Sequence, residues 1–309
     1  MPTETVYGLA ARIDSEEGLR RIFSVKQRPF FDPLIVHVAS IEEAKALVSE
    51  WNPRAEVLAQ SFWPGPLTLV LPKNEKVSSL ITSGLMTVGL RCPAHPLAQE
   101  LIRKAGVPLA APSANRFGRT SPTRADHVRQ EFQDQVFVLE GGESDVGIES
   151  TIVMIEEATL KLLRPGHLSI EVISSALRDA GLSFTWAQAS GKTEAPGQMK
   201  HHYMPAKPLV LSKQALAEST LLNEIKARLA ELPTEVDGVR LETPSSIQKI
   251  IRLTLPEDPV LAARALYQSL REAASGPGDV IVLNWPESRR KGDWVAVWDR
   301  LRKAASLDL

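Results

Sequence analysis

Two long basic side chains stand two positions apart at the end of a predicted helix. Lys26 and Arg28 precede Pro29, which cannot continue a helix, and the apolar run 34–38 follows. This spacing would bring both cations to the mouth of a sheet edge, where they are suited to bind phosphate. The same cations would also complement the dipole at a helix C-terminus, so the cluster by itself leaves a structural role open.

A second polar cluster, from Ala111 to Thr123, follows a short apolar run. It carries hydroxyl and amide side chains and two arginines, but no acid. Hydroxyl groups and free backbone amides in a Gly-containing loop are suited to a polyphosphate or nucleotide. The loop lacks the Gly spacing and the Lys-Ser/Thr pair of the standard phosphate loop, which disfavours a kinase-type NTPase. A polar surface loop that caps a helix at Ser121 or Thr123 is the alternative interpretation.

Polar side chains also lie inside apolar runs, where an unpaired polar group is costly. His37 lies within Leu-Ile-Val-His-Val, and Thr87 and Arg91 flank Val-Gly-Leu. A lone histidine in a strand is usually a structural residue. Polar residues on several strands instead indicate a shared polar groove, and the further members of this set are Thr5, Tyr7, Glu149, Ser150 and Thr151.

The sequence gives little support for a metal centre or a covalent nucleophile. His201 and His202 have no cysteine pair, third histidine or His-Glu-x-x-His helix beside them. Cys92, the only cysteine, precedes a proline and lacks the features of a nucleophile. No metal site is therefore predicted from side-chain motifs.

Short strands and amphipathic helices alternate along the first 180 residues. Runs rich in β-branched residues predict strands at 34–38, 67–71, 87–90, 108–110, 136–139 and 151–155. Helices are predicted at 15–25, 41–48, 53–62, 95–104 and 170–180. Ser40 and Glu43 form a capping box at the start of the second helix. These elements must position the polar clusters.

The alternation lapses at residues 181–207, which are rich in Ser, Thr, Gly and Pro and are typical of a linker. Beyond it, strands are predicted at 208–212, 239–242 and 279–284, and helices at 216–232, 260–274 and 294–305. The fold class is therefore α/β (α+β), with a first domain at 1–180 and a smaller α/β domain at 208–309.

The amino-acid composition limits the classes of protein to which the chain can belong. The chain has 309 residues, of which 43% are hydrophobic and 24% charged, as in soluble globular proteins of two domains. A net charge of -1 argues against a protein that coats nucleic acid or an anionic membrane. One cysteine, no signal peptide and no apolar run long enough to cross a bilayer predict a cytoplasmic protein without membrane contact.

Eight motifs, in order along the chain, resemble the YrdC-like domain of threonylcarbamoyl-adenylate synthases. They are Pro2–Leu9, Lys26–Pro29, Pro33–Val38, Trp63–Thr68, Val88–Pro93, Ala111–Asn115 with Ser121–Thr123, Glu149–Ile152 and Leu163–Gly166. The segment Pro196–Pro205 and the second α/β domain resemble the long, two-domain form of these enzymes. The resemblance covers nearly the whole chain.

The resemblance implies a twisted mixed-sheet domain with a concave, positively charged groove, a linker that crosses the groove, and a small Rossmann-like domain. It also implies a nucleotidyltransferase that condenses L-threonine, bicarbonate and ATP into threonylcarbamoyl-AMP and pyrophosphate. A separate tRNA-threonylcarbamoyl transferase complex then uses the product to modify tRNA. Mg²⁺ is the expected cofactor, bound through the phosphates of ATP.

The resemblance also assigns residues by motif. The L-threonine site is expected at Thr5, His37, Arg91, Ala111 and Thr151. The ATP site is expected at Arg28, Asp32, Thr87, Ser113, Ser121, Ser150, Arg164 and Tyr203, the last on an exposed linker that closes over the nucleotide. Lys26 and Arg28 would neutralise phosphate charge during catalysis. Asp32 stands where the family often has Asn, and near phosphates it would be tolerated mainly as a ligand of Mg²⁺.

The family ordinarily has a helix and an edge strand before the Pro-Thr-Glu-Thr motif, whereas here the motif begins at Pro2. The first domain is therefore expected to be short at its N-terminus, with less support for Thr5.

The alternative function is that of a YrdC-like protein that binds double-stranded RNA and acts in ribosome assembly or translation. Arg116, Arg119 and Arg124 would then make a weak contact with RNA phosphates. The acidic excess of the first half and the linker motif count against it. Carbamoyl transfer in hydrogenase maturation would need zinc-finger and acylphosphatase segments, which the sequence lacks.

Overall fold

The computed structural model describes residues 1–189, 194–199, 201–214, 217–229, 235–236, 239–240 and 247–309. It divides into two compact units, of which the first comprises Met1–Arg116 with Pro122–Gln198 and the second Phe117–Ser121 with Met199–Leu309. The chain therefore passes between the units three times: before Phe117, after Ser121 and after Gln198. The described part of the predicted linker 181–207 is shared between the two units.

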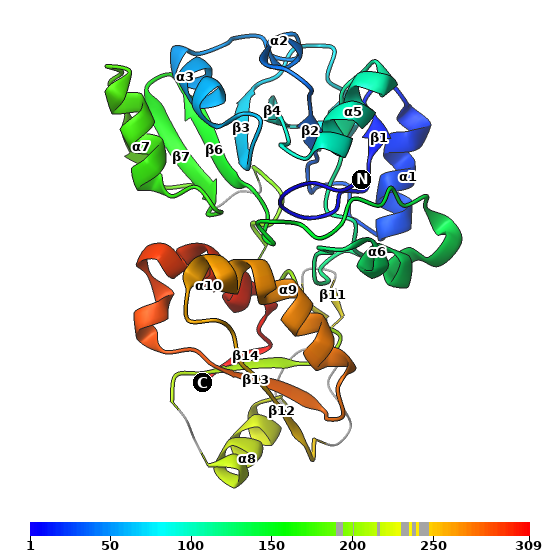
Figure 1. Ribbon diagram of the computed structural model, residues 1–309, viewed down its shortest axis with the longest axis vertical. Coiled ribbons are helices and arrows are strands. Elements are labelled where there is room, and N and C mark those ends of the chain that lie inside the picture. The colour runs from blue at the N-terminus through cyan, green and yellow to red at the C-terminus, as the bar shows by residue number, and fades with distance from the viewer. Residues whose placement is uncertain (190–193, 200, 215–216, 230–234, 237–238, 241–246) are drawn as a thin grey trace. The chain divides into compact units, whose positions relative to one another are not determined.

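The first unit is built on an eight-stranded mixed sheet with the strand order β1-β5-β2-β4-β3-β6-β7-β8 (Figure 1). Neighbours β2–β4, β3–β6 and β7–β8 are parallel and the other neighbours are antiparallel. The strands are β1 (Ala11–Arg12), β2 (Ile35–His37), β3 (Leu67–Pro72), β4 (Thr87–Arg91), β5 (Leu109–Ala110), β6 (Thr151–Glu156), β7 (Thr159–Arg164) and β8 (Thr185–Ala187). The predicted twisted mixed sheet is confirmed.

Most helices of the first unit begin at a side-chain cap that the sequence supplies, whereas α6 (Ala125–Phe132) begins after Arg124 without one. Ser15 and Ser40 accept hydrogen bonds from the backbone N–H groups of Gly18 and Glu43. Glu43 returns a bond by accepting from the N–H of Ala39 at 2.8 Å, which confirms a capping-box start. The helices are α1 (Glu16–Lys26), α2 (Ile41–Lys45), α3 (Pro53–Phe62), α4 (Ser79–Thr82), α5 (Pro96–Ala105), α6 (Ala125–Phe132), a 3₁₀ turn at Gln133–Gln135 and α7 (Ile170–Asp179).

The two faces of this sheet differ because side chains alternate along each strand. On one face, residues such as Val36, Leu69 and Leu90 join the main core with side chains of α1, α3 and α7. The opposite face carries a smaller apolar cluster of Ile35, Val70, Ile152, Met154, Leu163 and Ala195. His37 and Arg91 alternate with Val36 and Leu90, so this second face also receives the polar side chains predicted to line a groove.

The strand predicted at 136–139 is wrong, because this segment has no ladder partner in the described structure. Val136 and Val138 instead pack beside Tyr7 and Phe132, and Phe137 is 92% exposed. The alternating apolar pattern therefore reflects packing on a helix and a loop rather than strand pairing.

The second unit contains a four-stranded parallel sheet with the order β12-β13-β9-β14. Parallel strands connected through helices confirm the predicted Rossmann-like α/β class. The elements are β9 (Leu209–Ser212), α8 (Glu218–Leu229), the hairpin β10 (Glu235–Val236) and β11 (Val239–Arg240), β12 (Ile250–Leu253), α9 (Pro259–Ser275), β13 (Val280–Asn284), 3₁₀ turns at Glu287–Arg290 and Gly292–Trp294, α10 (Val295–Ala304) and β14 (Leu307–Asp308).

Parts of two predictions for this unit, residues 216 and 230–232 of a helix and 241–242 of a strand, lie outside the described residues. Within the described part of the chain, no helix combines the length and apolarity that a membrane span requires.

Candidate functional site

The two basic and polar clusters of the sequence meet in the first unit. Lys26 is the last residue of α1, its side chain is 1% exposed, and its Nζ donates to the backbone carbonyls of Ser113 and Asn115. Burial and the nearby charge of Arg28 hold the pKa of Lys26 well below its usual value. The loop after β5 thus wraps around a buried amine, and this amine is the centre of the predicted phosphate site.

Arg28 is held in a buried ion pair. Its Nη2 lies 2.8 Å from Oδ2 of Asp32, and its Nε and Nη2 donate to the carbonyls of Asp32 and Pro33. Burial raises the pKa of Asp32, although the positive charges of Arg28 and Lys26 act in the opposite direction. The carboxylate of Asp32, expected as a ligand of Mg²⁺, is therefore engaged with Arg28 in this structure.

Arg91 binds the N-terminal loop to the end of β4. Its Nη1 donates to Oγ1 of Thr5 at 2.7 Å, its Nη2 lies 2.7 Å from Oε1 of Glu4, and its Nε donates to the carbonyl of Gly65. The side chains of Arg91 and Glu4 are 5% and 10% exposed. Glu4 was not among the predicted site residues. The sequence signal that could have marked it is its place in the Pro2–Leu9 motif, which also contains Thr5.

His37 lies beside Arg91 across the sheet. The two residues are register partners of the parallel strands β2 and β4, and His37 also pairs with Leu109 of β5. Burial, with a smaller contribution from the charge of Arg91, lowers the pKa of His37 from 6.5 to about 3. The imidazole is therefore neutral at physiological pH, and together with Thr5 and Arg91 it forms one polar patch.

The lowered pKa of His37 predicts a pH-dependent stability. Between about 3 and 6.5 the unfolded chain binds a proton at His37 that the folded chain does not bind, so the free energy of unfolding falls as pH decreases through this range. Between about pH 7 and pH 5, wild-type protein should lose about 2 kcal/mol more than the His37→Gln variant. Urea unfolding of both proteins at both pH values measures this difference. Equal pH dependence would contradict neutral burial of His37.

Ser150 and Arg164 form the opposite wall of the groove face. Oγ of Ser150 lies 2.7 Å from Oγ1 of Thr68, and Arg164 donates to both the carbonyl and the hydroxyl of Ser150. Arg164 also donates to the carbonyl of Pro196 at 3.2 Å, which holds the described linker segment 194–198 to the first unit.

Thr151 and Ala111 are fixed by the backbone around them. Oγ1 of Thr151 donates to the carbonyl of Leu168 and accepts from its N–H, and the N–H of Ala111 donates to the carbonyl of Ile35. Gly166 permits the close approach that this needs, since a Cβ at residue 166 would lie 2.3 Å from the backbone nitrogen of Thr151.

Thr87 lines a small cavity beneath the linker. The cavity, of about 10 Å³, lies between strands β2, β3 and β4 and the segment Glu194–Pro196, and has room for roughly one water molecule. Ala195 is 2% exposed and packs on the groove face with Ile35 and Val70. Linker residues therefore occupy the face on which the polar side chains converge.

Ser121 and Tyr203 belong to the second unit. Tyr203 is 1% exposed, with its ring centroid 4.2 Å from that of His202 and 5.7 Å from that of Tyr267. The expectation of an exposed Tyr203 is therefore wrong, because residues 202–204 are packed into this unit rather than extended in solvent. Of the predicted residues, the structure brings together Lys26 with Ser113, Arg28 with Asp32, Thr5 with Arg91, and Ser150 with Arg164.

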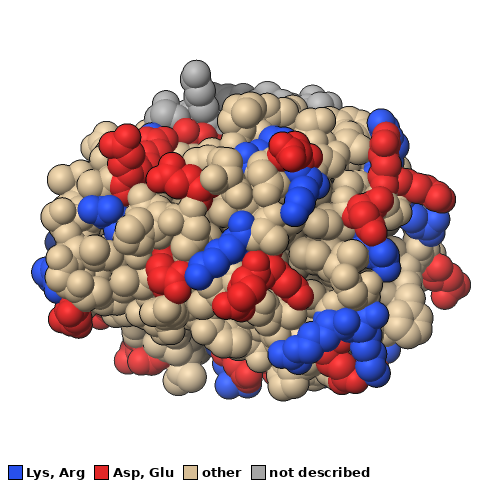
Figure 2. Space-filling view, turned by 90° about the horizontal axis from the view of Figure 1, so that it is seen from above, with Lys and Arg blue, Asp and Glu red and all other residues tan. Residues whose placement is uncertain are grey.

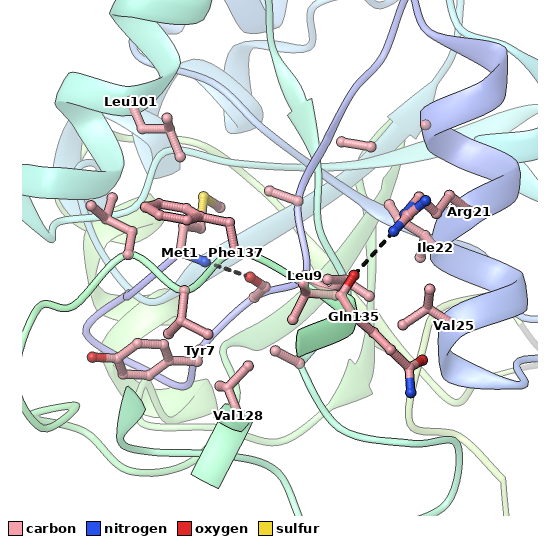
Figure 3. Close-up of a pocket in the computed structure, with 18 residues that line it drawn as sticks. Met1, Tyr7, Leu9, Arg21, Ile22, Val25, Leu101, Val128, Gln135 and Phe137 are labelled. Carbon is pink, nitrogen blue, oxygen red and sulfur yellow. Dashed lines mark hydrogen bonds between the residues drawn. The ribbon is translucent and has the colours of Figure 1, made fainter. Parts of the chain in front are cut away.

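A larger cavity of about 420 Å³ lies elsewhere in the first unit (Figure 3). Its lining is mostly apolar, and of the residues predicted to form a polar groove only Tyr7 contributes to it. Two hydrogen bonds cross it, from the N-terminal amine to the carbonyl of Gly8 and from Arg21 to the carbonyl of Gln135. The polar chemistry is thus concentrated on the groove face rather than in this cavity.

Charge and metal ligands add two further observations. On the face seen in Figure 2, basic and acidic side chains are intermixed. Among the described residues, no three His, Cys, Asp or Glu side chains form a group suited to hold a metal ion.

Two family descriptions match the sequence. The family described as "Telomere recombination" matches residues 1–166, and the family described as "Threonylcarbamoyl-AMP synthase, C-terminal domain" matches residues 151–306.

The chain is also similar to individual proteins along most of its length. It is 38% identical over 306 residues to the threonylcarbamoyl-AMP synthase of Pyrococcus abyssi, covering 98% of this chain and 89% of that protein. It is 34% identical over 311 residues to the enzyme of the same name from Bacillus subtilis, covering 98% and 88%. The crystal structure of P. abyssi Sua5 complexed with L-threonine aligns with a TM-score of 0.82 at 35% identity, covering 100% of this chain and 91% of that chain.

Proposed function

Because this chain belongs to the threonylcarbamoyl-AMP synthase family, we infer that it makes threonylcarbamoyl-AMP from L-threonine and ATP. The observation that carries this inference is the polar face of the first sheet, where the Thr5–Arg91 patch lies on the same sheet as Ser150 and Arg164 and the Lys26 site lies at the end of α1. Such an arrangement offers an amino-acid site and a phosphate site within one unit. We propose that the third substrate is bicarbonate.

The proposed reaction is a nucleotidyl transfer. The amine of threonine adds to bicarbonate with loss of water and gives a carbamate. A carbamate oxygen then attacks the α-phosphorus of ATP, the bond to the β-phosphate oxygen breaks, and pyrophosphate leaves. No covalent enzyme intermediate is needed, so the task of the chain is to position the reactants and to stabilise developing charge.

Each polar group has a proposed part in this reaction. Arg91 would bind the carboxylate of threonine, with Thr5, His37, Ala111 and Thr151 around it. Lys26 and Arg28 would stabilise negative charge on the phosphates, and the remaining ATP contacts would come from Asp32, Thr87, Ser113, Ser121, Ser150, Arg164 and Tyr203. The pairing of His37 with Arg91 across the neighbouring strands β2 and β4 supports the placement of both residues at one ligand.

We propose that Mg²⁺ enters with ATP. The donor set fits a nucleotide-bound ion, since phosphates supply oxygen ligands and Asp32 is already paired with Arg28. When bound, the ion would neutralise phosphate charge during pyrophosphate release.

The linker segment 194–196 would have to move to admit ATP. The 10 Å³ cavity beneath it is far too small for a nucleotide. Its return over the bound substrates would exclude water from the carbamate and from the mixed anhydride. We further propose that the unstable product passes to a tRNA-threonylcarbamoyl transferase complex. The mixed charge on the face in Figure 2 gives no specific support for RNA binding.

Incubation of the full chain with ATP, Mg²⁺, L-threonine and bicarbonate tests the proposal. Pyrophosphate release should require both threonine and bicarbonate, and chromatography should detect threonylcarbamoyl-AMP. Serine should react more slowly, by roughly 10- to 200-fold, because one methyl group against an apolar wall is worth about 1–3 kcal/mol. Release of pyrophosphate at an equal rate without threonine would refute the proposed function.

A further inference from the structure

A five-residue loop belongs to the second unit although the residues on both sides of it belong to the first. Residues 117–121 pack with Met199–Leu309, whereas Arg116 and Pro122 are part of the first unit. Just before this loop, the carbonyls of Ser113 and Asn115 accept from Lys26. Loop 117–121 therefore continues directly from the chain that surrounds the proposed phosphate site, and it ends at Ser121, a proposed ATP contact.

The second unit holds loop 117–121 by its backbone. The N–H of Met204 donates to the carbonyl of Gly118 at 2.8 Å, and the N–H of Thr120 donates to the carbonyl of Met204 at 3.2 Å. These bonds form a parallel bridge between Arg119 and Met204. Oγ1 of Thr120 also donates to the carbonyl of Tyr203 at 3.2 Å. A loop this short is fixed by such a set of bonds.

Arg271 of α9 supplies the charged contact to the same loop. Its Nη2 donates to the carbonyl of Thr120, the residue before Ser121. A hydrogen bond from a guanidinium is stronger than one between neutral groups. Thr120 and Ser121 are 3% and 0% exposed, and the bond from the half-buried Arg271 is itself partly buried, which strengthens it relative to a fully exposed contact.

The residues that hold the loop are themselves rigidly placed. Tyr203 has a φ of 66°, a left-handed conformation that a non-glycine residue adopts at a cost. Its ring packs against those of His202 and Tyr267, and the guanidinium of Arg300, which is fully buried, lies 5.6 Å from its centroid. Packing therefore fixes Tyr203 in the orientation that directs its carbonyl to Thr120.

We propose that Arg271 is a positioning residue for ATP: through the carbonyl of Thr120 it fixes loop 117–121, which ends at the proposed ATP contact Ser121. Arg271, Tyr203 and Met204 together form what we call the loop clamp. The proposal rests on the proposed function in that Ser121 is taken as an ATP contact. It assigns Tyr203 a role in holding this loop rather than only a contact with the nucleotide.

The test measures ATP and threonine separately in full-length protein. Arg271→Ala should weaken the binding of Mg²⁺–ATP, followed by calorimetric titration, at least about tenfold, because a charged hydrogen bond is lost. Threonine binding should stay within about twofold of wild type, because Thr5 and Arg91 pair with each other within the first unit, whereas the clamp belongs to the second. Arg271→Lys should restore most of the ATP affinity. Arg252→Ala, which removes an exposed arginine on β12, is the matched control and should bind both ligands normally.

Two results would overturn the proposal: unchanged ATP affinity in Arg271→Ala, or an equal loss of ATP and threonine affinity. If Arg271→Ala does not fold, Arg271→Gln is judged by the same criteria. Binding is scored independently of catalysis. Wild-type protein that binds ATP but makes no threonylcarbamoyl-AMP would therefore refute the proposed function, while the ATP titrations of wild type and Arg271→Ala would still decide the role of Arg271.

Discussion

Replacing Lys26 with Met should reduce the rate of threonylcarbamoyl-AMP synthesis by about 100- to 1,000-fold, the usual effect of removing one group that stabilises transition-state charge. The Lys26 ammonium is buried against two carbonyls and is the cation at the centre of the proposed phosphate site. Methionine retains most of the volume of the aliphatic stem and removes the charge. Pyrophosphate release at saturating ATP and threonine measures the effect.

Measurements of stability and of threonine binding distinguish a catalytic role of Lys26 from a purely structural one. The two carbonyls lose their donor in Lys26→Met, so the free energy of unfolding should fall by about 1–3 kcal/mol while threonine still binds. Lys104→Met, whose side chain is 75% exposed, is the control and should be fully active. A Lys26→Met enzyme within threefold of the wild-type rate would leave Lys26 with only the role of complementing the dipole of α1.

The second large effect is expected at Arg91. Its removal leaves the carboxylate of Glu4 buried without its ion-pair partner, so Arg91→Ala should lower the free energy of unfolding by about 3–5 kcal/mol. The same variant should bind threonine at least tenfold more weakly, because a hydrogen bond to a charged group is worth about 1.5–3 kcal/mol. Urea unfolding and calorimetric titration with L-threonine measure the two effects separately.

Glu4→Gln separates the contribution of Arg91 to stability from its contribution to threonine binding. In Glu4→Gln/Arg91→Ala the unpaired charge is absent, so stability should recover partly while threonine binding stays weak. Glu4→Gln alone should bind threonine at least as tightly as wild type, because a competing carboxylate is gone. Wild-type threonine affinity in the double variant would show that Arg91 serves only to hold the N-terminal loop.

Local patterns in the sequence were sufficient for much of the first sheet. Alternating or continuous apolar runs predicted the strands that became β2, β3, β4 and β6. Strand β7, which forms a hairpin with β6, was not predicted from the sequence. The turn between them contains Glu157, a non-glycine residue with a φ of 51°, in place of the Asn-Gly or Asp-Gly pair that marks such turns. Turn chemistry of this kind gives no sequence signal.

Tertiary contacts explain what the motifs did not predict in the site. Glu4 and Arg91 are 87 positions apart along the chain, and no periodicity links them, yet they form a buried ion pair. Tyr203 lies in a segment whose composition is typical of an exposed linker, but three aromatic and basic neighbours bury it. Composition describes a segment by itself and contains no information on what packs against it.

The three passages of the chain between the units have a consequence for biosynthesis. A domain that follows another in sequence normally folds after it and independently of it. Here loop 117–121 leaves the ribosome with the first unit, but its partners Met204 and Arg271 are synthesised later. At about 5–20 residues per second, the roughly 150 residues from Thr120 to Arg271 take on the order of 10–30 seconds to make. During this interval the nascent first unit can form its sheet, whereas loop 117–121 still lacks its contacts with Met204 and Arg271. The proposed ATP contact at Ser121 is therefore fixed only late in synthesis.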